Sequence, residues 1–159
     1  MDAKQCGCPL IDDGEWHRRA FSWEGRTFFR KEVRFFFKTP MGIEERTREA
    51  AEEIERRGYA LDEPCVILVE QASFRGAVLI GILDPGEKTP DVVTFDSHPL
   101  LSVVHRSREP RVGPGLKTLR QFVVESHRAV TDTFIWYTTC PRCFEAERIY
   151  TTVLLARTA

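Results

Sequence analysis

The chain lacks any apolar run long enough to span a bilayer, and its N-terminus has neither a basic start nor the apolar core of a signal peptide. It also lacks an excess of one charge, because 23 Lys and Arg residues face 24 Asp and Glu residues and the two signs alternate. Nucleic-acid binders usually gather Lys and Arg into a dominant patch. We therefore expect a cytoplasmic protein with no membrane partner and no nucleic-acid partner.

Familiar catalytic motifs are absent as well. The chain contains no Gly-x-Ser-x-Gly nucleophile motif, no His-Glu-x-x-His zinc motif and no phosphate-binding glycine loop. Their absence argues against the common hydrolase mechanisms. Hydrolysis by this chain would have to use a carboxylate that activates water.

The composition fits one globular domain of the α+β class. The 159 residues are enough for one core but few for two, and 42% hydrophobic with 30% charged residues is typical of a globular protein. The clearest helix is expected at 42–57, where Ile43, Ala50 and Ile54 form one stripe. Gly58 follows it at the position of a helix C-cap.

The predicted elements follow the order strand, helix, strand, strand twice. The first set is a strand in 26–38, a helix in 42–57 and a hairpin of 66–71 with 77–83; the second is a strand at 92–95 or 100–105, a helix in 115–127 and strands at 134–139 and 149–156. We expect these repeats to form a curved, mostly antiparallel sheet with both helices on one face. The single domain, 1–159, would comprise an N-terminal arm at 1–25, a first repeat at 26–83 and a second at 92–156. A ligand would bind on the other face or in the cleft between the halves.

Four of the five cysteines form two pairs near the chain ends: Cys6 and Cys8 in Gln-Cys-Gly-Cys-Pro, and Cys140 and Cys143 in Thr-Cys-Pro-Arg-Cys. Cys-x2-Cys lets one turn present two sulfurs to one ion, and Gly7 allows the tight bend that Cys-x-Cys needs. In a reducing compartment, such thiols are more often metal ligands than disulfides. We expect all four to bind a structural zinc ion that joins the arm to the last hairpin.

Three alternatives stay open for these cysteines: disulfides, thiols with no common role, and a redox pair formed by Cys140 and Cys143. Redox pairs of the thioredoxin type lie between a strand and a helix N-terminus, which lowers the pKa of the first thiol. Here the pattern predicts strands on both sides of the pair, which argues against redox chemistry. Cys65, just before a strand, is expected to be a small core residue.

The repeated order, together with Leu101-Ser-Val-Val-His105, Pro110 and the helix from Gly115, resembles the GyrI-like, SOUL-type small-molecule-binding fold. A narrower resemblance, over nearly the whole chain, is to a family of bacterial, archaeal and plant proteins labelled hydrolase. The motifs that carry it are Cys6-x-Cys8-Pro9, Trp16, Phe21-x-Trp23, Phe36-Phe37 and Tyr137-Thr-Thr-Cys140-Pro-x-Cys143. The resemblance implies binding of amphipathic cationic compounds, or hydrolysis of a reactive small molecule by a pocket Glu with aromatic neighbours.

Glu70 is the carboxylate that best fits this implication. It is in phase with Val66 and Leu68 within an apolar strand. Burial there would raise its pKa, which suits a group that binds a cation or acts as general acid or base. A rim residue paired with Arg is the alternative, because charged groups avoid full burial.

Phe35, Phe37 and Trp136 are the expected ligand-binding aromatics on strand phase alone, although aromatics in strands are more often core residues. His105, which ends a strand before a Pro-rich loop, and Tyr137 would assist Glu70 if a reaction occurs. The leading interpretation is a small-molecule binding or sensing domain with a structural zinc site. The alternative is a hydrolase in which Glu70 activates water on a small reactive or amphipathic substrate.

Overall fold

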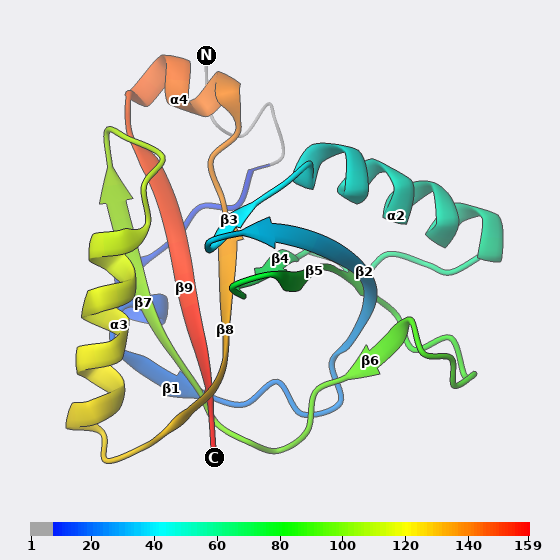
Figure 1. Cartoon of the computed structure of the whole chain (residues 1–159), viewed down its shortest axis with the longest axis horizontal. Coiled ribbons are helices and arrows are strands. Elements are labelled where there is room, and N and C mark those ends of the chain that lie inside the picture. The colour runs from blue at the N-terminus through cyan, green and yellow to red at the C-terminus, as the bar shows by residue number, and fades with distance from the viewer. Residues whose placement is uncertain (1–7) are drawn as a thin grey trace. The chain divides into compact units, whose positions relative to one another are not determined.

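A computed structural model describes residues 8–159 of the chain (Figure 1). Contacts divide these residues into two compact units, one formed by residues 8–22 together with Pro99–Ala159 and the other by Trp23–His98. Each unit is described by itself. None of the helices in the described residues is long and apolar enough to cross a membrane.

The Trp23–His98 unit is an antiparallel sheet with one helix. Its elements are β2 (Thr27–Phe36), β3 (Thr39–Pro40), α2 (Ile43–Arg57), β4 (Ile67–Glu70), β5 (Arg75–Ile82) and β6 (Val92–Thr94). The strand order is β4-β5-β2, and β6 and β3 pair with opposite ends of the outer edge of β2. The central strand β5 is buried from Gly76 to Ile82.

The second unit has a sheet of the same kind. Its elements are α1 (Asp13–Trp16), β1 (Arg19–Phe21), β7 (Leu100–Ser107), α3 (Gly113–Glu125), β8 (Val130–Tyr137), α4 (Pro141–Glu147) and β9 (Tyr150–Thr158). The strand order is β8-β9-β7-β1, and every pairing is antiparallel. Residues 153–156 of the central strand β9 are buried on both faces.

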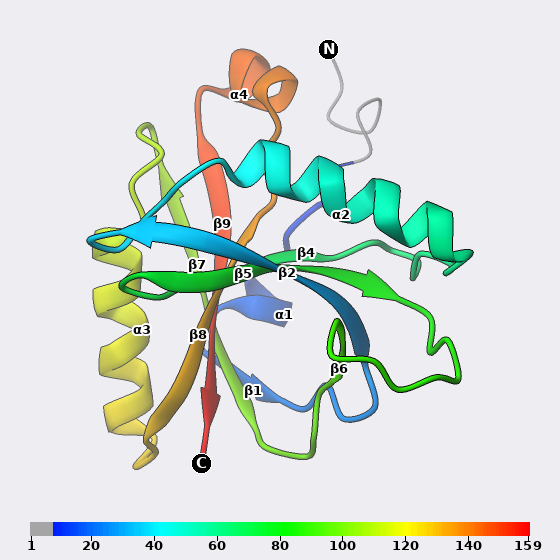
Figure 2. The same ribbon diagram turned by 45° about the vertical axis from the view of Figure 1, so that its right-hand side comes forward.

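The two units share one topology, which confirms the predicted α+β class and its internal repeat. In each, a long strand leads into a helix, and the two strands after the helix form a hairpin whose second strand is central. The units differ at the tip of that hairpin. A short turn joins β4 to β5, whereas α4 joins β8 to β9 (Figures 1 and 2).

The long helices form where the apolar stripes predicted them. Ala50 and Ile54 of α2 are buried where the helix packs on β2 and β5, and Gly58 ends it in the left-handed region at φ 74°. Leu119 and Val123 of α3 are buried where that helix packs on β7 and β9.

Two local predictions were wrong. Phe37 was expected in a strand, but β2 ends at Phe36, and Phe37 and Lys38 form the turn to β3 with φ of 45° and 69°. The segment between the last two strands was expected to contain no helix, but Cys140 is the N-cap of α4. Neither a two-residue turn nor a seven-residue helix is long enough to give a clear period in the sequence.

Gly115 offers a test of how closely α3 packs on its sheet. A Cβ at this position would lie 2.6 Å from Leu154 Cδ1 and 2.8 Å from His105 Cβ, whereas a Cβ at Gly113 would meet nothing within 4 Å. Gly115→Ala should therefore lower the free energy of unfolding by about 1–3 kcal/mol, as other overpacked sites do. Gly113→Ala, in the same helical turn, is the matched control and should leave it nearly unchanged. Urea unfolding would measure both; equal stabilities would contradict the packing of α3.

Candidate metal centre

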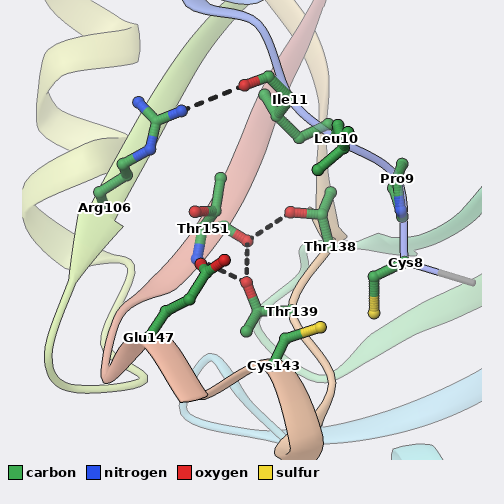
Figure 3. A pocket seen from close by; sticks show the side chains of 10 residues that line it. All are labelled: Cys8, Pro9, Leu10, Ile11, Arg106, Thr138, Thr139, Cys143, Glu147 and Thr151. Atoms are coloured by element: carbon green, nitrogen blue, oxygen red, sulfur yellow. Dashed lines mark hydrogen bonds between the residues drawn. The ribbon is translucent and has the colours of Figure 1, made fainter. Parts of the chain in front are cut away.

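Three cysteine sulfurs from both ends of the chain come together in the unit that contains Pro99–Ala159. The Sγ atoms of Cys8, Cys140 and Cys143 all lie within 4.8 Å of one another. Cys143 is buried, and the other two are partly buried. Figure 3 shows the sulfurs of Cys8 and Cys143 directed toward each other across the side of a small pocket.

The positions of Cys140 and Cys143 follow from the way α4 begins. Pro141 occupies the first turn, where its fixed φ and missing N–H suit a helix start. Immediately before the helix, Thr138 Oγ1 donates to Thr151 O at 2.7 Å, and Thr139 Oγ1 accepts from Thr151 N at 2.8 Å (Figure 3). These bonds fasten the start of α4 to β9, so both thiols of the Cys-x2-Cys motif point to one side.

The far end of α4 is held by aromatic stacking. The rings of Phe144 and Tyr150 are 4.0 Å apart between centroids and nearly parallel. Arg148 ends the helix in the left-handed region at φ 58°, and its N–H donates to Phe144 O. A helix of seven residues is marginal by itself, so these contacts at both ends account for its presence.

The N-terminal arm carries Cys8 to the same place. Arg106 on β7 forms an ion pair with Asp13 and donates to Ile11 O at 3.2 Å (Figure 3). Further along the arm, Trp16 O accepts a hydrogen bond from Ser102 Oγ. Pairing of β1 with β7 completes the attachment.

This donor set fits a thiophilic metal ion. Tetrahedral zinc with Zn–S bonds of about 2.3 Å holds its sulfurs roughly 3.8 Å apart, and the three sulfurs here are already close to that spacing. Within residues 8–159 no disulfide joins the cysteines. The three thiols could therefore hold a metal; Cys6, the fourth expected ligand, lies outside the described residues.

The argument made from the sequence against a redox pair was incorrect in one respect. Cys140 and Cys143 do lie between a strand, β8, and the start of a helix, α4. What separates this site from a simple dithiol is the third thiol, Cys8, within 4.8 Å of the pair. Cys65 lies elsewhere, and burial, followed by the charges of Glu63 and Asp62, raises the pKa of its thiol.

A polar cavity of about 150 Å³ adjoins the thiols. Its lining residues are Cys8, Pro9, Leu10, Ile11, Arg106, Thr138, Thr139, Cys143, Glu147 and Thr151 (Figure 3). The volume suffices for a few water molecules or a very small molecule. The threonines and Arg106 already bond to the backbone here, so they serve the local structure.

His105 and Tyr137 lie in one row on the sheet of the same unit. Each is directly opposite Thr152 of β9, so all three side chains share a face. His105 Nε2 donates to Arg111 O at 2.9 Å, which requires the Nε2–H tautomer. Partial burial raises the pKa of Tyr137, so the phenol stays protonated at neutral pH. The assignment of His105 and Tyr137 as assisting residues stays a prediction.

The three aromatic residues proposed to bind a ligand fall into two groups, buried and exposed. Trp136 is 6% exposed and packs edge to face on Trp16, 5.3 Å between ring centroids. Phe35 is 4% exposed and its ring covers Gly76, whereas Phe37 is 70% exposed in the turn. The two buried rings are core residues, and Phe37 is on the surface.

Glu70 lies at the end of β4, and its Oε2 accepts a hydrogen bond from Arg30 Nη2 at 3.3 Å. Glu70 and Glu32 both lie opposite Ala77, so the two carboxylates share a face of the sheet. Phe35 is three residues from Glu32 along β2 and therefore points to the other face. One cleft over this sheet can be lined by Glu70 or by Phe35, but not by both.

The supporting residues Arg106, Thr138 and Thr139 were missed from the sequence. Each acts through a bond to the backbone of a distant segment, and no motif marks such a bond. The only available signal was the pair of threonines directly before the Cys-x2-Cys motif.

Removal of one thiol tests the centre directly. We expect purified protein to contain a metal ion that is lost in Cys143→Ser, because the central, buried ligand is removed. The free energy of unfolding should fall by several kcal/mol, since metal binding stabilises only the folded state. Elemental analysis and urea unfolding would measure the two effects. Cys65→Ser is the control and should retain the metal; loss of metal from both variants or neither would argue against the centre.

Comparison with known proteins supports the fold and identifies the family. No curated protein matches the chain. The crystal structure of the EcmrR C-terminal domain, a GyrI-like fold, is similar with a TM-score of 0.71 and 11% identity over 91% of this chain and 98% of that one. The cryo-EM structure of the EcmrR–DNA complex in EcmrR-RPo is similar with a TM-score of 0.68 and 11% identity, over 90% of this chain and 57% of that chain. The sequence matches the family described as Bacterial hydrolase over residues 1–158, and the chain therefore belongs to that family.

Proposed function

We propose that the protein is a small-molecule-binding domain whose N-terminal arm is held by a structural zinc ion. The observation that carries the proposal is the convergence of Cys8, Cys140 and Cys143 within a fold of the GyrI-like type. The resemblance found in the sequence supports the binding role, since it implies binding of amphipathic cationic compounds, as some GyrI-like proteins do.

Zinc is the proposed ion because it is borderline soft and accepts compact tetrahedral coordination by thiolates. Cys6 is the proposed fourth ligand. Four thiolates would leave no open position for water, so the ion would stabilise the arm and α4 rather than act on a substrate. The thiols must lose their protons to bind it, so zinc affinity should fall as the pH falls.

Glu70 is the proposed anchor for a ligand. It is the carboxylate at the end of an apolar strand, its side chain is 24% exposed, and it shares a face with the buried Leu68. A cationic group on a partly apolar ligand would replace Arg30 as its partner. The ligand class we infer is therefore amphipathic and cationic.

The binding proposal and the zinc proposal can be tested together. A thermal-shift screen of amphipathic cations on zinc-loaded protein should find a ligand, and isothermal titration should give its affinity. Cys8→Ser should lower the melting temperature yet leave that affinity nearly unchanged, because the thiol and Glu70 belong to different units. Cys65→Ser is the control for loss of a thiol. Failure of a folded, metal-loaded protein to bind any such compound would count against the binding role.

A second candidate function is hydrolysis, which the family's description favours. In this alternative, Glu70 would activate water on the substrate. Glu70→Gln should then lower turnover of a hydrolysed substrate by at least a hundredfold while substrate still binds, as expected when a general base is lost. Glu32→Gln removes a carboxylate from the same face and should have little effect. Activity that survives in Glu70→Gln would rule out this assignment.

A further inference from the structure

Three phenylalanines are exposed together at one end of the Trp23–His98 unit. Phe36 ends β2, Phe37 lies in the turn to β3 and Phe74 lies in the turn between β4 and β5. These residues are 63%, 70% and 61% exposed. The centroid of Phe37 is 4.6 Å from that of Phe36 and 6.0 Å from that of Phe74. We call these rings, with Arg34, Lys38 and Arg75, the aromatic-basic tip.

Hydrogen bonds hold the two turns of the tip together. Phe35 N donates to Phe74 O at 2.6 Å, and Gln71 Nε2 donates to Lys38 O at 3.2 Å. These bonds tie the β2–β3 turn to the β4–β5 turn, which lie side by side in Figures 1 and 2.

The β2–β3 turn also stores strain. Both Phe37 and Lys38 adopt left-handed φ values, which glycine or asparagine normally supplies in a two-residue hairpin turn. A bulky residue there is unfavourable and persists only where the surrounding structure imposes it. The turn thus presents the ring of Phe37 to solvent at a conformational cost.

The charge around these rings is all positive. Arg34 and Arg75 lie directly opposite each other on β2 and β5, an arrangement of like charges that destabilises a sheet. No acidic residue occurs at positions 33–43 or 71–83. Among the ion pairs of the described residues, none involves Arg34, Lys38 or Arg75. The nearest carboxylates on this face, Glu32 and Glu70, lie two residues further along the strands, opposite Ala77. Glu70 pairs with Arg30 rather than with the tip.

We propose that the aromatic-basic tip docks on an anionic lipid surface. Phenylalanine rings insert at the boundary between headgroups and acyl chains, and each basic side chain near an anionic leaflet adds attraction. The chain as a whole has a net charge of −1, so this attraction is local and would orient the molecule tip first. This proposal departs from the expectation of no membrane partner. That expectation rested on the lack of a membrane-spanning run, which peripheral docking does not need.

Other partners fit the tip less well. Two copies meeting at this surface would oppose six positive charges, and three partly exposed rings offer roughly 400 Å², about half of what each side of a stable interface needs. Single-stranded nucleic acid would need a longer basic groove with free aromatic faces. Here Phe36 and Phe74 both pack at steep angles against Phe37.

Vesicle co-sedimentation of the metal-loaded full chain tests the proposal. The protein should bind phosphatidylcholine vesicles with about 30% phosphatidylglycerol more tightly than pure phosphatidylcholine, and salt should weaken the binding. A variant carrying Arg34→Gln, Lys38→Gln and Arg75→Gln should lose roughly a hundredfold in apparent affinity. Phe36→Ser with Phe37→Ser and Phe74→Ser should abolish binding.

Matched controls alter equally exposed residues elsewhere. Val124→Ser removes a side chain that is 71% exposed on α3, and Lys117→Gln with Arg120→Gln removes exposed positive charge from the same helix. Both should bind vesicles as the wild type does. Circular dichroism would establish that every variant is folded.

Two outcomes would overturn the proposal: no binding to anionic vesicles, or binding that the tip variants leave intact. If vesicle binding is absent and the tip variants abolish a concentration-dependent dimer or the capture of oligo-dT, the tip serves that other partner instead. The readout is independent of Glu70 and of the thiols, so its failure would leave the proposed function untouched.

Discussion

The close approach of three thiols is the constraint that joins the N-terminal arm to α4. Two thiolates at 4.8 Å repel each other by roughly 3–4 kcal/mol at an effective dielectric constant of about 20, and three such pairs exist here. The cluster is therefore stable only as neutral thiols or as thiolates around a cation. A bound cation would remove the repulsion and gain the attraction of every ligand, which would couple folding of this corner to metal binding. Contacts of Arg106 and Ser102 and the β1–β7 pairing also hold the arm, so the ion would reinforce an arm that these contacts already place.

The repeated topology shows where this protein can vary and where it cannot. The central strands β5 and β9 are buried on both faces, so nearly every side chain in them is needed for packing. The hairpin tips are not subject to this packing requirement. At the tip of one hairpin the chain inserts α4 with two of the thiols; at the tip of the other it places Phe74 and Arg75. The same position in the repeat thus carries two thiols of the candidate metal centre in one unit and part of the aromatic-basic tip in the other.

The sequence predicted well what depends on long patterns. The stripe of α2, the second helix and the hairpins each extend over enough residues to show a period, and the spacing of the cysteines named Cys8, Cys140 and Cys143. Prediction from the sequence failed where a few residues determine the local conformation. A Phe-Lys turn carries no glycine or asparagine signal. Hydrogen bonds that the N–H groups of Phe35 and Lys38 donate to Phe74 O and Ser73 O impose it. Strand phase likewise selected Phe35 and Glu70 separately, but only the register shows that they face opposite sides.

That register also narrows the chemistry available to the chain. Glu70 shares its face with Glu32, Arg30 and the buried Leu68, so a ligand over it would meet two carboxylates and one guanidinium beside an apolar side chain. Such a set would discriminate by charge, because a cation could displace Arg30 and pair with Glu70 whereas the carboxylates would repel an anion. The aromatic-basic tip has the opposite preference, although it lies on the same unit. A partner that carries both charges, such as a cationic amphiphile held at an anionic membrane, would satisfy the two surfaces at once.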